Sequence, residues 1–278
     1  MSDCRTIVIT GATDGLGRAV ALSLAADGHR LILHGRRSEA LAALADEVGA
    51  TGTEKPAIVV ADLSSLAEVH TLPDQIGAVT DHVDVLVNNA GVGGGEPDGH
   101  DRRLTVDGHE LRFAVNYLAP FDLTHRLLPQ ITDGGRVVNV ASLGQAPVRF
   151  DDLSSEHGYD GWLAYNRSKL ALITWGFTLA ERQHRVSVNS LHPGTYMPTK
   201  MVLDNAISQI HTLKSGVEAT TRLIVDPGLE GVTGRFYDRL RQTPAHVDQA
   251  YDRSVRERLW QLSLELTGAP EPACSAPA

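Results

Sequence analysis

Cysteine, aromatic residues and long apolar runs are all scarce in this sequence of 278 residues. The two cysteines, Cys4 and Cys274, lie near opposite ends of the chain, so neither a disulfide framework nor a zinc site is indicated. The longest apolar runs, such as the one at 137–140, fall far short of the roughly 20 residues that a membrane span requires. We therefore expect no metal and no membrane partner, in a reducing, cytoplasmic setting.

Positive charge is also in the minority, because 25 lysines and arginines face 34 aspartates and glutamates. The formal net charge of −9 disfavours nucleic-acid phosphates and anionic membrane surfaces as partners. The first apolar strand is predicted to begin at Thr6, which leaves no room for a cleaved signal peptide. We expect no nucleic acid among the partners of this protein.

What the sequence holds in quantity is an alternation of short apolar runs with longer amphipathic segments. The apolar runs predict strands at 6–10, 30–34, 57–61, 83–88, 136–141, 186–191 and 234–237. Apolar residues at three- and four-residue spacing predict helices at 16–27, 39–48, 108–128 and 162–184. This alternation predicts an α/β fold, a single doubly wound parallel sheet (Rossmann fold) with helices on both faces.

No linker or internal repeat divides the chain, so residues 1–266 are interpreted as a single domain. Mixed polarity after a strand end predicts a loop over the substrate site at around 196–214. Residues 267–278 hold three prolines and four alanines and predict a disordered tail.

A glycine-rich turn joins the first predicted strand to the first helix, with the sequence Thr10-Gly11-Ala12-Thr13-Asp14-Gly15-Leu16-Gly17. Glycine permits positive φ and close backbone approach, and a helix N-terminus offers unpaired N–H groups to a pyrophosphate. A tight turn that binds nothing is the alternative, but the place between strand and helix favours a dinucleotide site.

The second predicted strand ends in His34-Gly35-Arg36-Arg37, without the acidic residue that binds the ribose 2′-hydroxyl of NAD. A guanidinium suits a 2′-phosphate, because it forms paired, charge-assisted hydrogen bonds. We therefore predict that Arg36 and Arg37 bind the 2′-phosphate and that NADP(H) is preferred over NAD(H). The alternative is that both arginines are solvated surface charges.

Tyr165 and Lys169 are four residues apart in the helix predicted at 162–184, so their side chains share one helix face. A nearby ammonium favours the phenolate and lowers the pKa of a tyrosine from its reference value of about 10. The pair can then act as a general acid or base near neutral pH. By itself, it is also compatible with an ordinary amphipathic helix.

Five features, in this order along the chain, resemble the short-chain dehydrogenase/reductase family. They are the turn at 10–17, Asn88-Asn89-Ala90-Gly91 after the fourth strand, Asn116 in the next helix, Ser142 after the fifth strand, and Tyr165 with Lys169. The resemblance covers about residues 5–240. It implies that Ser142 holds a substrate carbonyl, Tyr165 donates the proton, Lys169 lowers the tyrosine pKa and binds the nicotinamide ribose, and Asn116 maintains a water relay.

The resemblance also implies where the cofactor lies, with Asp62 beside the adenine and Asn89 supporting the site. The segment 193–199 resembles the nicotinamide-contacting segment of the family, but Thr199 lies one residue later than usual, so Thr195 and Thr199 both stay open. Asp14 stands where some NADPH-using relatives carry a basic residue. The implied cofactor-binding set comprises Gly11, Thr13, Asp14, Gly15, Leu16, Gly17, Arg36, Arg37, Asp62, Leu63, Asn89, Ala90, Gly91, Tyr165, Lys169, Pro193, Gly194, Thr195 and Thr199.

Three segments resemble the branch of the family that includes retinol dehydrogenases and protochlorophyllide reductases, namely 104–111, the acidic insert 149–160, and 230–237. The function implied is that of an NADP(H)-dependent carbonyl reductase or alcohol dehydrogenase. Hydride passes reversibly between the cofactor and the carbonyl/alcohol pair of a small, fairly apolar substrate, with Tyr165 as general acid/base. A non-catalytic NADPH-binding sensor and a reductase of C=C bonds are the alternatives.

Relatives commonly pair through the long helices around the active site, so the resemblance implies a homodimer or homotetramer. Apolar residues of the Tyr165 helix can serve either as core or as interface, and core is the safer interpretation for most of them. These residues are Leu170, Leu172, Ile173 and Trp175.

Overall fold

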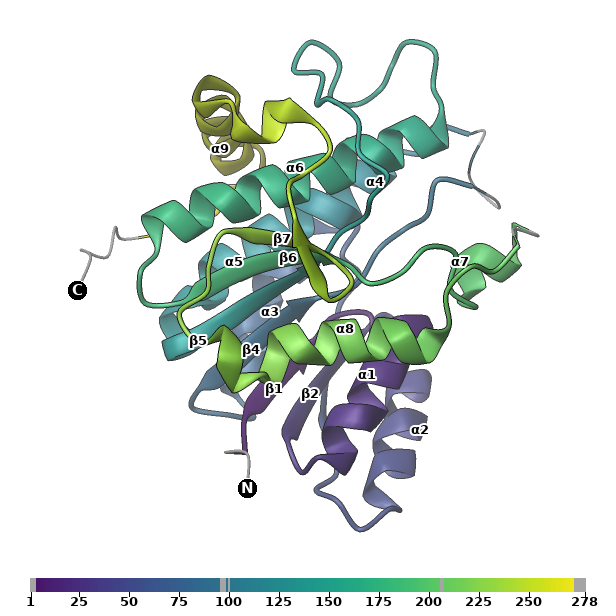
Figure 1. Cartoon of the computed structure of the whole chain (residues 1–278), viewed down its shortest axis with the longest axis vertical. Helices are drawn as coiled ribbons and strands as arrows, with labels where there is room; N and C mark the ends of the chain where they lie inside the picture. Colours follow the sequence, from purple (N-terminus) through teal and green to yellow (C-terminus); the bar gives the residue numbers. More distant parts are fainter. Residues whose placement is uncertain (1–3, 96–98, 100, 206–207, 273–278) are drawn as a thin grey trace.

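An eight-stranded sheet forms the centre of the computed structural model, which describes residues 4–95, 99, 101–205 and 208–272 (Figure 1). The strand order is β3-β2-β1-β4-β5-β6-β7-β8, and the pairings are parallel apart from the antiparallel pair β7–β8. The strand bounds are β1 Thr6–Ile9, β2 Arg30–Gly35, β3 Ala57–Val60, β4 Val83–Asn88, β5 Ile131–Val140, β6 Ser187–His192, β7 Arg235–Asp238 and β8 Arg241–Thr243.

Helices cover both faces of the sheet, which confirms the doubly wound α/β fold (Figure 1). One apolar core lies under α1 (Gly15–Ala26), α2 (Ser38–Gly49) and α8 (Leu213–Val225). The other lies under α3 (Leu66–Gly77), α5 (Ala119–Leu127), α6 (Gly161–Arg182) and α9 (Arg253–Thr267). Because successive strand side chains point to opposite faces, Ile7 and Ile9 enter the first core and Val8 enters the second.

The helix predicted at 108–128 is divided into three pieces. Helix α4 covers Leu111–Phe113, a π-helical segment covers Ala114–Leu118, and α5 follows directly. The wider π turn carries Asn116, and such turns often occur at functional sites. Apolar spacing does not distinguish a π turn from an α turn over five residues, so the sequence pattern predicts one continuous helix.

The chain stays packed just beyond the end of α9. Thr267 and Ala269 are buried, and His125 Nδ1 lies 3.1 Å from the carbonyl oxygen of Pro270. Pro270 thus contacts α5, while residues 273–278 of the predicted disordered tail lie outside the described residues. Among the helices that the structure describes, none is long and apolar enough to span a bilayer.

The apolar residues of α6 belong to the core. Leu170, Leu172, Ile173 and Trp175 are all buried within the single chain, and α9 packs against α6. This confirms the interpretation of these four side chains as core residues.

Candidate active site

The predicted site residues gather where β1, β4, β5 and β6 end at the same edge of the sheet. The strand order reverses beside β1, because the chain runs outward to β2 and β3 and then returns to β4. In doubly wound folds the ligand binds at this switch point, outside the carboxyl ends of the strands.

The turn after β1 approaches the neighbouring backbone closely. Gly11 and Gly15 have φ of +65° and +51°, the left-handed region that favours glycine. A Cβ atom at Gly17 would overlap Asn89 Nδ2 and the Gly11 carbonyl oxygen. Asn89 Nδ2 itself donates hydrogen bonds of 2.8 Å to Thr10 O and 3.2 Å to Gly11 O. Asn89, the residue after β4, thus holds the turn in shape, and the absence of a side chain at Gly17 permits this close approach.

Several predicted cofactor residues shape this turn. Asp14 caps α1, since its carboxylate accepts a 2.6 Å hydrogen bond from Gly15 N. Ala90 lies against Gly11, and the Thr13 methyl group lies against Gly35 at the end of β2. The side chains of Leu16 and Leu63 are buried in the two apolar cores instead.

His34, in β2, also supports the turn, a role that the sequence pattern does not predict. Its Nδ1 accepts from Gly11 N at 3.4 Å, and its Nε2 lies 3.1 Å from Ala61 O. Burial lowers the pKa of His34 to about 4, so the ring is neutral at physiological pH. The signal available in the sequence was a histidine within an otherwise apolar strand.

Arg36 and Arg37 follow β2 and line a hollow of about 320 Å³ formed by residues 36–40. The Arg36 side chain is 69% exposed, and its Nη1 lies 3.6 Å from Asp62 Oδ2. Asp62 also accepts a hydrogen bond from Ser64 N at 2.9 Å. The structure therefore brings the predicted adenine-side residue and the two arginines together at the open end of β2 and β3.

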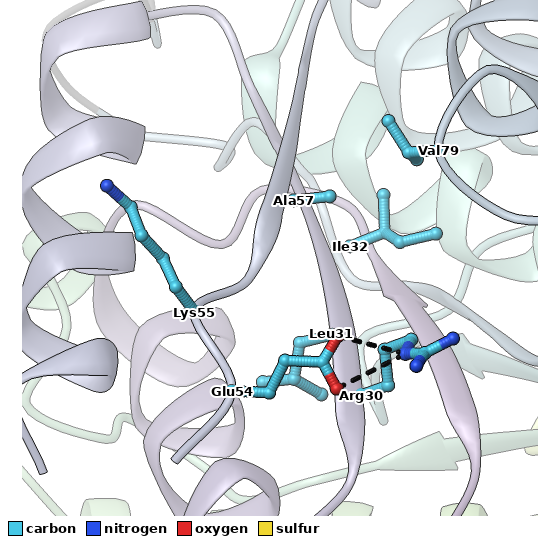
Figure 2. Close-up of a pocket in the computed structure, with 7 residues that line it drawn as sticks. All are labelled: Arg30, Leu31, Ile32, Glu54, Lys55, Ala57 and Val79. Atoms are coloured by element: carbon cyan, nitrogen blue, oxygen red, sulfur yellow. Dashed lines mark hydrogen bonds and ion pairs between the residues drawn. The ribbon is translucent and has the colours of Figure 1, made fainter. Parts of the chain in front are cut away.

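A second hollow, of about 330 Å³, lies at the amino-terminal ends of β2 and β3 (Figure 2). Arg30 and Ala57, the first residues of β2 and β3, line it, and Arg30 is paired there with Glu54 at 3.1 Å. None of the predicted site residues lines this hollow, so it is separate from the candidate active site.

Tyr165, Lys169 and Ser142 converge beside the turn. Helix α6 begins at Gly161, where the Asp160 carboxylate caps it by accepting from Leu163 N at 2.8 Å. Lys169 Nζ lies 5.6 Å from the centre of the Tyr165 ring and donates a 2.9 Å hydrogen bond to Val140 O at the end of β5. Ser142, two residues beyond β5, is hydrogen-bonded to the Tyr165 side chain.

The pKa values of the pair are set by burial. Burial raises the pKa of the Tyr165 phenol, and its hydrogen bond with Ser142 acts in the lowering direction. Burial also lowers the pKa of the Lys169 amine from 10.5 to about 8. The net direction for Tyr165 differs from the lowering that the resemblance implied, because removing a phenolate from water outweighs the other influences in this protein.

Asn116 ties the loop after β4 to α6. Its Oδ1 accepts from Val92 N at 2.7 Å, and its Nδ2 donates to Val92 O and to Ser168 Oγ, each at 3.0 Å. Ser168 Oγ in turn donates to the Tyr165 carbonyl at 2.7 Å. Gly91 fits between Asn116 and Lys169, since a Cβ there would lie 3.2 Å from Asn116 Oδ1 and 3.5 Å from Lys169 Nζ.

The segment after β6 places Thr195 and Thr199, the two candidates for the nicotinamide contact, in different surroundings. Thr195 Oγ1 lies 2.9 Å from His192 Nε2, and Thr195 N donates to His211 Nδ1 at 2.9 Å. Thr199 directly precedes the short helix α7 (Lys200–Leu203) without a side-chain capping hydrogen bond. It lies against the glycine-rich turn, 3.2 Å from where a Gly15 Cβ would be. Gly194, after Pro193, packs against Met197.

A turn of this shape, with a hydrogen-bonded serine and tyrosine and a buried lysine, defines a class of nicotinamide-dependent enzymes. A family model described as short chain dehydrogenase matches residues 5–208. The chain therefore belongs to the short-chain dehydrogenase family of oxidoreductases, which use a nicotinamide cofactor.

Particular relatives place the chain within that family. Retinol dehydrogenase 14 of Mus musculus is 34% identical over 294 aligned residues, covering 95% of this chain and 86% of that protein. A Mycobacterium paratuberculosis protein of known crystal structure is 30% identical, with a TM-score of 0.78 and coverage of 96% of this chain and 95% of that one. A short chain dehydrogenase from Burkholderia cenocepacia J2315, solved in complex with NADP, is 26% identical, with a TM-score of 0.65 and coverage of 84% and 95%. The expected retinol dehydrogenase-like branch is confirmed.

Proposed function

We propose that this protein is an NADP(H)-dependent carbonyl reductase or alcohol dehydrogenase, acting on a small, fairly apolar substrate with Tyr165 as general acid/base. The observation that carries the proposal is the convergence of Ser142, Tyr165 and Lys169 beside the glycine turn. The proposed cofactor-binding set is the one given by the resemblance, and both Thr195 and Thr199 remain candidates for the contact with the nicotinamide.

The residues at the turn fit a dinucleotide. Glycine at positions 11 and 17 lets the turn pack directly against Ala90 and Asn89, where a Cβ would collide. This packing fixes the backbone next to the N-terminus of α1, and a helix N-terminus suits a pyrophosphate. The exposed guanidinium of Arg36 and the neighbouring Arg37 supply positive charge for a 2′-phosphate. The NADP in the Burkholderia relative supports the same preference.

The bound cofactor supplies or accepts the hydride in such a reaction. During reduction, Tyr165 donates its phenolic proton to the carbonyl oxygen, so the product is a neutral alcohol. The Ser142 hydroxyl, within hydrogen-bond reach of the phenol, orients the same oxygen. Lys169 Nζ, 5.6 Å from the centre of the Tyr165 ring, stabilises the phenolate left after proton transfer. In alcohol oxidation the phenolate takes the proton back.

Apolar side chains close to Tyr165 support a fairly apolar substrate. The Trp162 ring, 40% exposed, stands edge-on to Tyr165 with ring centres 6.2 Å apart. Met201 of α7 lies against Gly93 on the loop after β4. We propose that the segment around 196–214 forms the outer wall of the substrate site.

The direct test is a spectroscopic screen of NADPH and NADH consumption over aldehydes, ketones, quinones and enones. The proposal expects carbonyl reduction, with a KM for NADPH at least tenfold below that for NADH, as one guanidinium–phosphate contact provides. Turnover of enones to saturated ketones would indicate C=C reduction instead. Tight NADPH binding without turnover of any compound would indicate a sensor.

A further inference from the structure

Two buried charges lie outside the proposed catalytic machinery. Arg112 is 0% exposed and Glu110 is 1% exposed, and Arg112 Nη1 lies 3.4 Å from Glu110 Oε1. The second carboxylate oxygen, Glu110 Oε2, accepts from Phe113 N at 2.8 Å. Removing two charges from water carries a large desolvation cost. A buried ion pair is therefore better explained by the one geometry that it fixes than by a gain in stability.

The pair joins three segments that are distant in sequence. Arg112 Nε donates a 2.7 Å hydrogen bond to the carbonyl oxygen of Gly93, on the loop after β4. The Tyr159 hydroxyl, just before α6, donates to Glu110 Oε1 at 2.9 Å and also contacts Arg112. Burial and the adjacent carboxylate raise the pKa of Tyr159, so its hydroxyl keeps the proton that it donates.

The backbone held by this network forms a wall next to Tyr165. A Cβ at Gly94 would lie 2.6 Å from Trp162 Cα, and one at Gly161 would lie 2.5 Å from Gly94 O. The loop after β4 is therefore packed directly on the first turn of α6. Trp162, in that turn, is the residue whose ring stands edge-on to Tyr165.

We propose that Glu110, Arg112 and Tyr159 form a positioning network that sets the Gly93–Gly94 backbone and Trp162 relative to Tyr165, and so determines how bulky carbonyl substrates bind. This inference rests on the proposed function. The three side chains act through the wall and do not touch the reacting atoms, so their loss affects substrate binding more than cofactor binding.

The test is Tyr159→Phe, which removes one hydroxyl and leaves the buried ion pair in place. We expect the KM for a bulky aryl ketone to rise about tenfold, the effect of losing one hydrogen bond to a charged group. The KM for a small aldehyde and the Kd for NADPH should change less than about twofold, because neither ligand depends on a hydrogen bond of the network. Tyr251→Phe is the matched control, because its hydroxyl accepts from Ala245 N at 2.7 Å in the C-terminal segment.

An unchanged KM for the bulky ketone in Tyr159→Phe would overturn the inference. Equal losses for both substrates and for NADPH, together with a lower Tm, would also overturn it, since they indicate general destabilisation. Failure of the wild-type protein to reduce any carbonyl would refute the proposed function itself and is thereby distinguished. Glu110→Gln keeps an acceptor for Phe113 N and provides a second variant, for which the same selective rise in KM is expected.

Discussion

At the residue scale, burial and hydrogen bonding act in opposite directions on the pKa of the Tyr165 phenol. Burial raises the pKa of Tyr165, which keeps its proton available for carbonyl reduction at neutral pH. The amine of Lys169, with its pKa lowered to about 8, changes charge just above neutrality. The rate of carbonyl reduction should therefore fall as the pH rises through about 8, because Lys169 loses the positive charge that stabilises the Tyr165 phenolate after proton transfer.

The Ser142→Ala substitution tests the opposing influence on Tyr165. The hydrogen bond from Ser142 acts to lower the tyrosine pKa, so its removal should raise that pKa further. Because alcohol oxidation requires the phenolate, the rising limb of the oxidation rate against pH should move to higher pH in this variant. Initial rates of NADP reduction measured from neutral to alkaline pH provide the check. The control is Thr71→Ala, which removes an exposed hydroxyl on α3 and should retain the wild-type pH profile. A Ser142→Ala variant with lower oxidation rates but an unshifted pH profile would contradict the account.

At the element scale, the strands β1 to β7 were predictable because each contains a short run with buried apolar residues. The three-residue strand β8, Arg-Gln-Thr, carries no apolar signal, and its antiparallel place at the sheet edge was not predicted. Helix α3 was not predicted, because Pro73 interrupts the usual helical pattern within it. The Glu110–Arg112 pair was missed because charged residues in a sequence usually indicate surface.

Gly17→Ala tests how the strand-to-helix turn is built. A Cβ at Gly17 would overlap Asn89 Nδ2 and Gly11 O, and the overpacking should cost about 1–3 kcal/mol or displace the turn. We expect the KM for NADPH to rise at least tenfold, which corresponds to about 1.4 kcal/mol. Gly77→Ala in α3 is the control, because its Cβ would make an ordinary contact of 3.6 Å. Cofactor titration of both variants measures the difference, and equal affinity in the two would show that the close approach has no role in binding.

At the scale of the whole molecule, α9 completes the second core. Trp260 is 1% exposed, lies edge-on to Phe121 with ring centres 5.8 Å apart, and has the Arg182 guanidinium 4.3 Å above its ring. The packing of Pro270 could not be predicted from composition, because it comes from a contact with His125 of α5, far away in the sequence. The oligomeric state stays a prediction, and sedimentation measures it.

Trp260→Ala should lower the free energy of unfolding by about 3–5 kcal/mol, the usual effect of truncating a buried aromatic residue. Trp162→Ala is a matched comparison of the same chemistry at a position that is 40% exposed, and it should cost less than half as much. Urea unfolding followed by circular dichroism gives both values. A loss for Trp260→Ala of less than about 1 kcal/mol would indicate that α9 contributes little to the core.

Resemblance identified Ser142, Tyr165 and Lys169 before their positions were known, but their pKa directions depend on burial that no linear pattern contains. The measurement that tests their proposed chemistry most directly is the turnover of Tyr165→Phe with a carbonyl substrate, paired with NADPH titration of the same variant. We expect turnover to fall by about 10²–10⁴-fold, since the acid that completes the alcohol is missing, with the Kd for NADPH almost unchanged. Turnover within a few-fold of the wild type would show that another group donates the proton and would contradict the account.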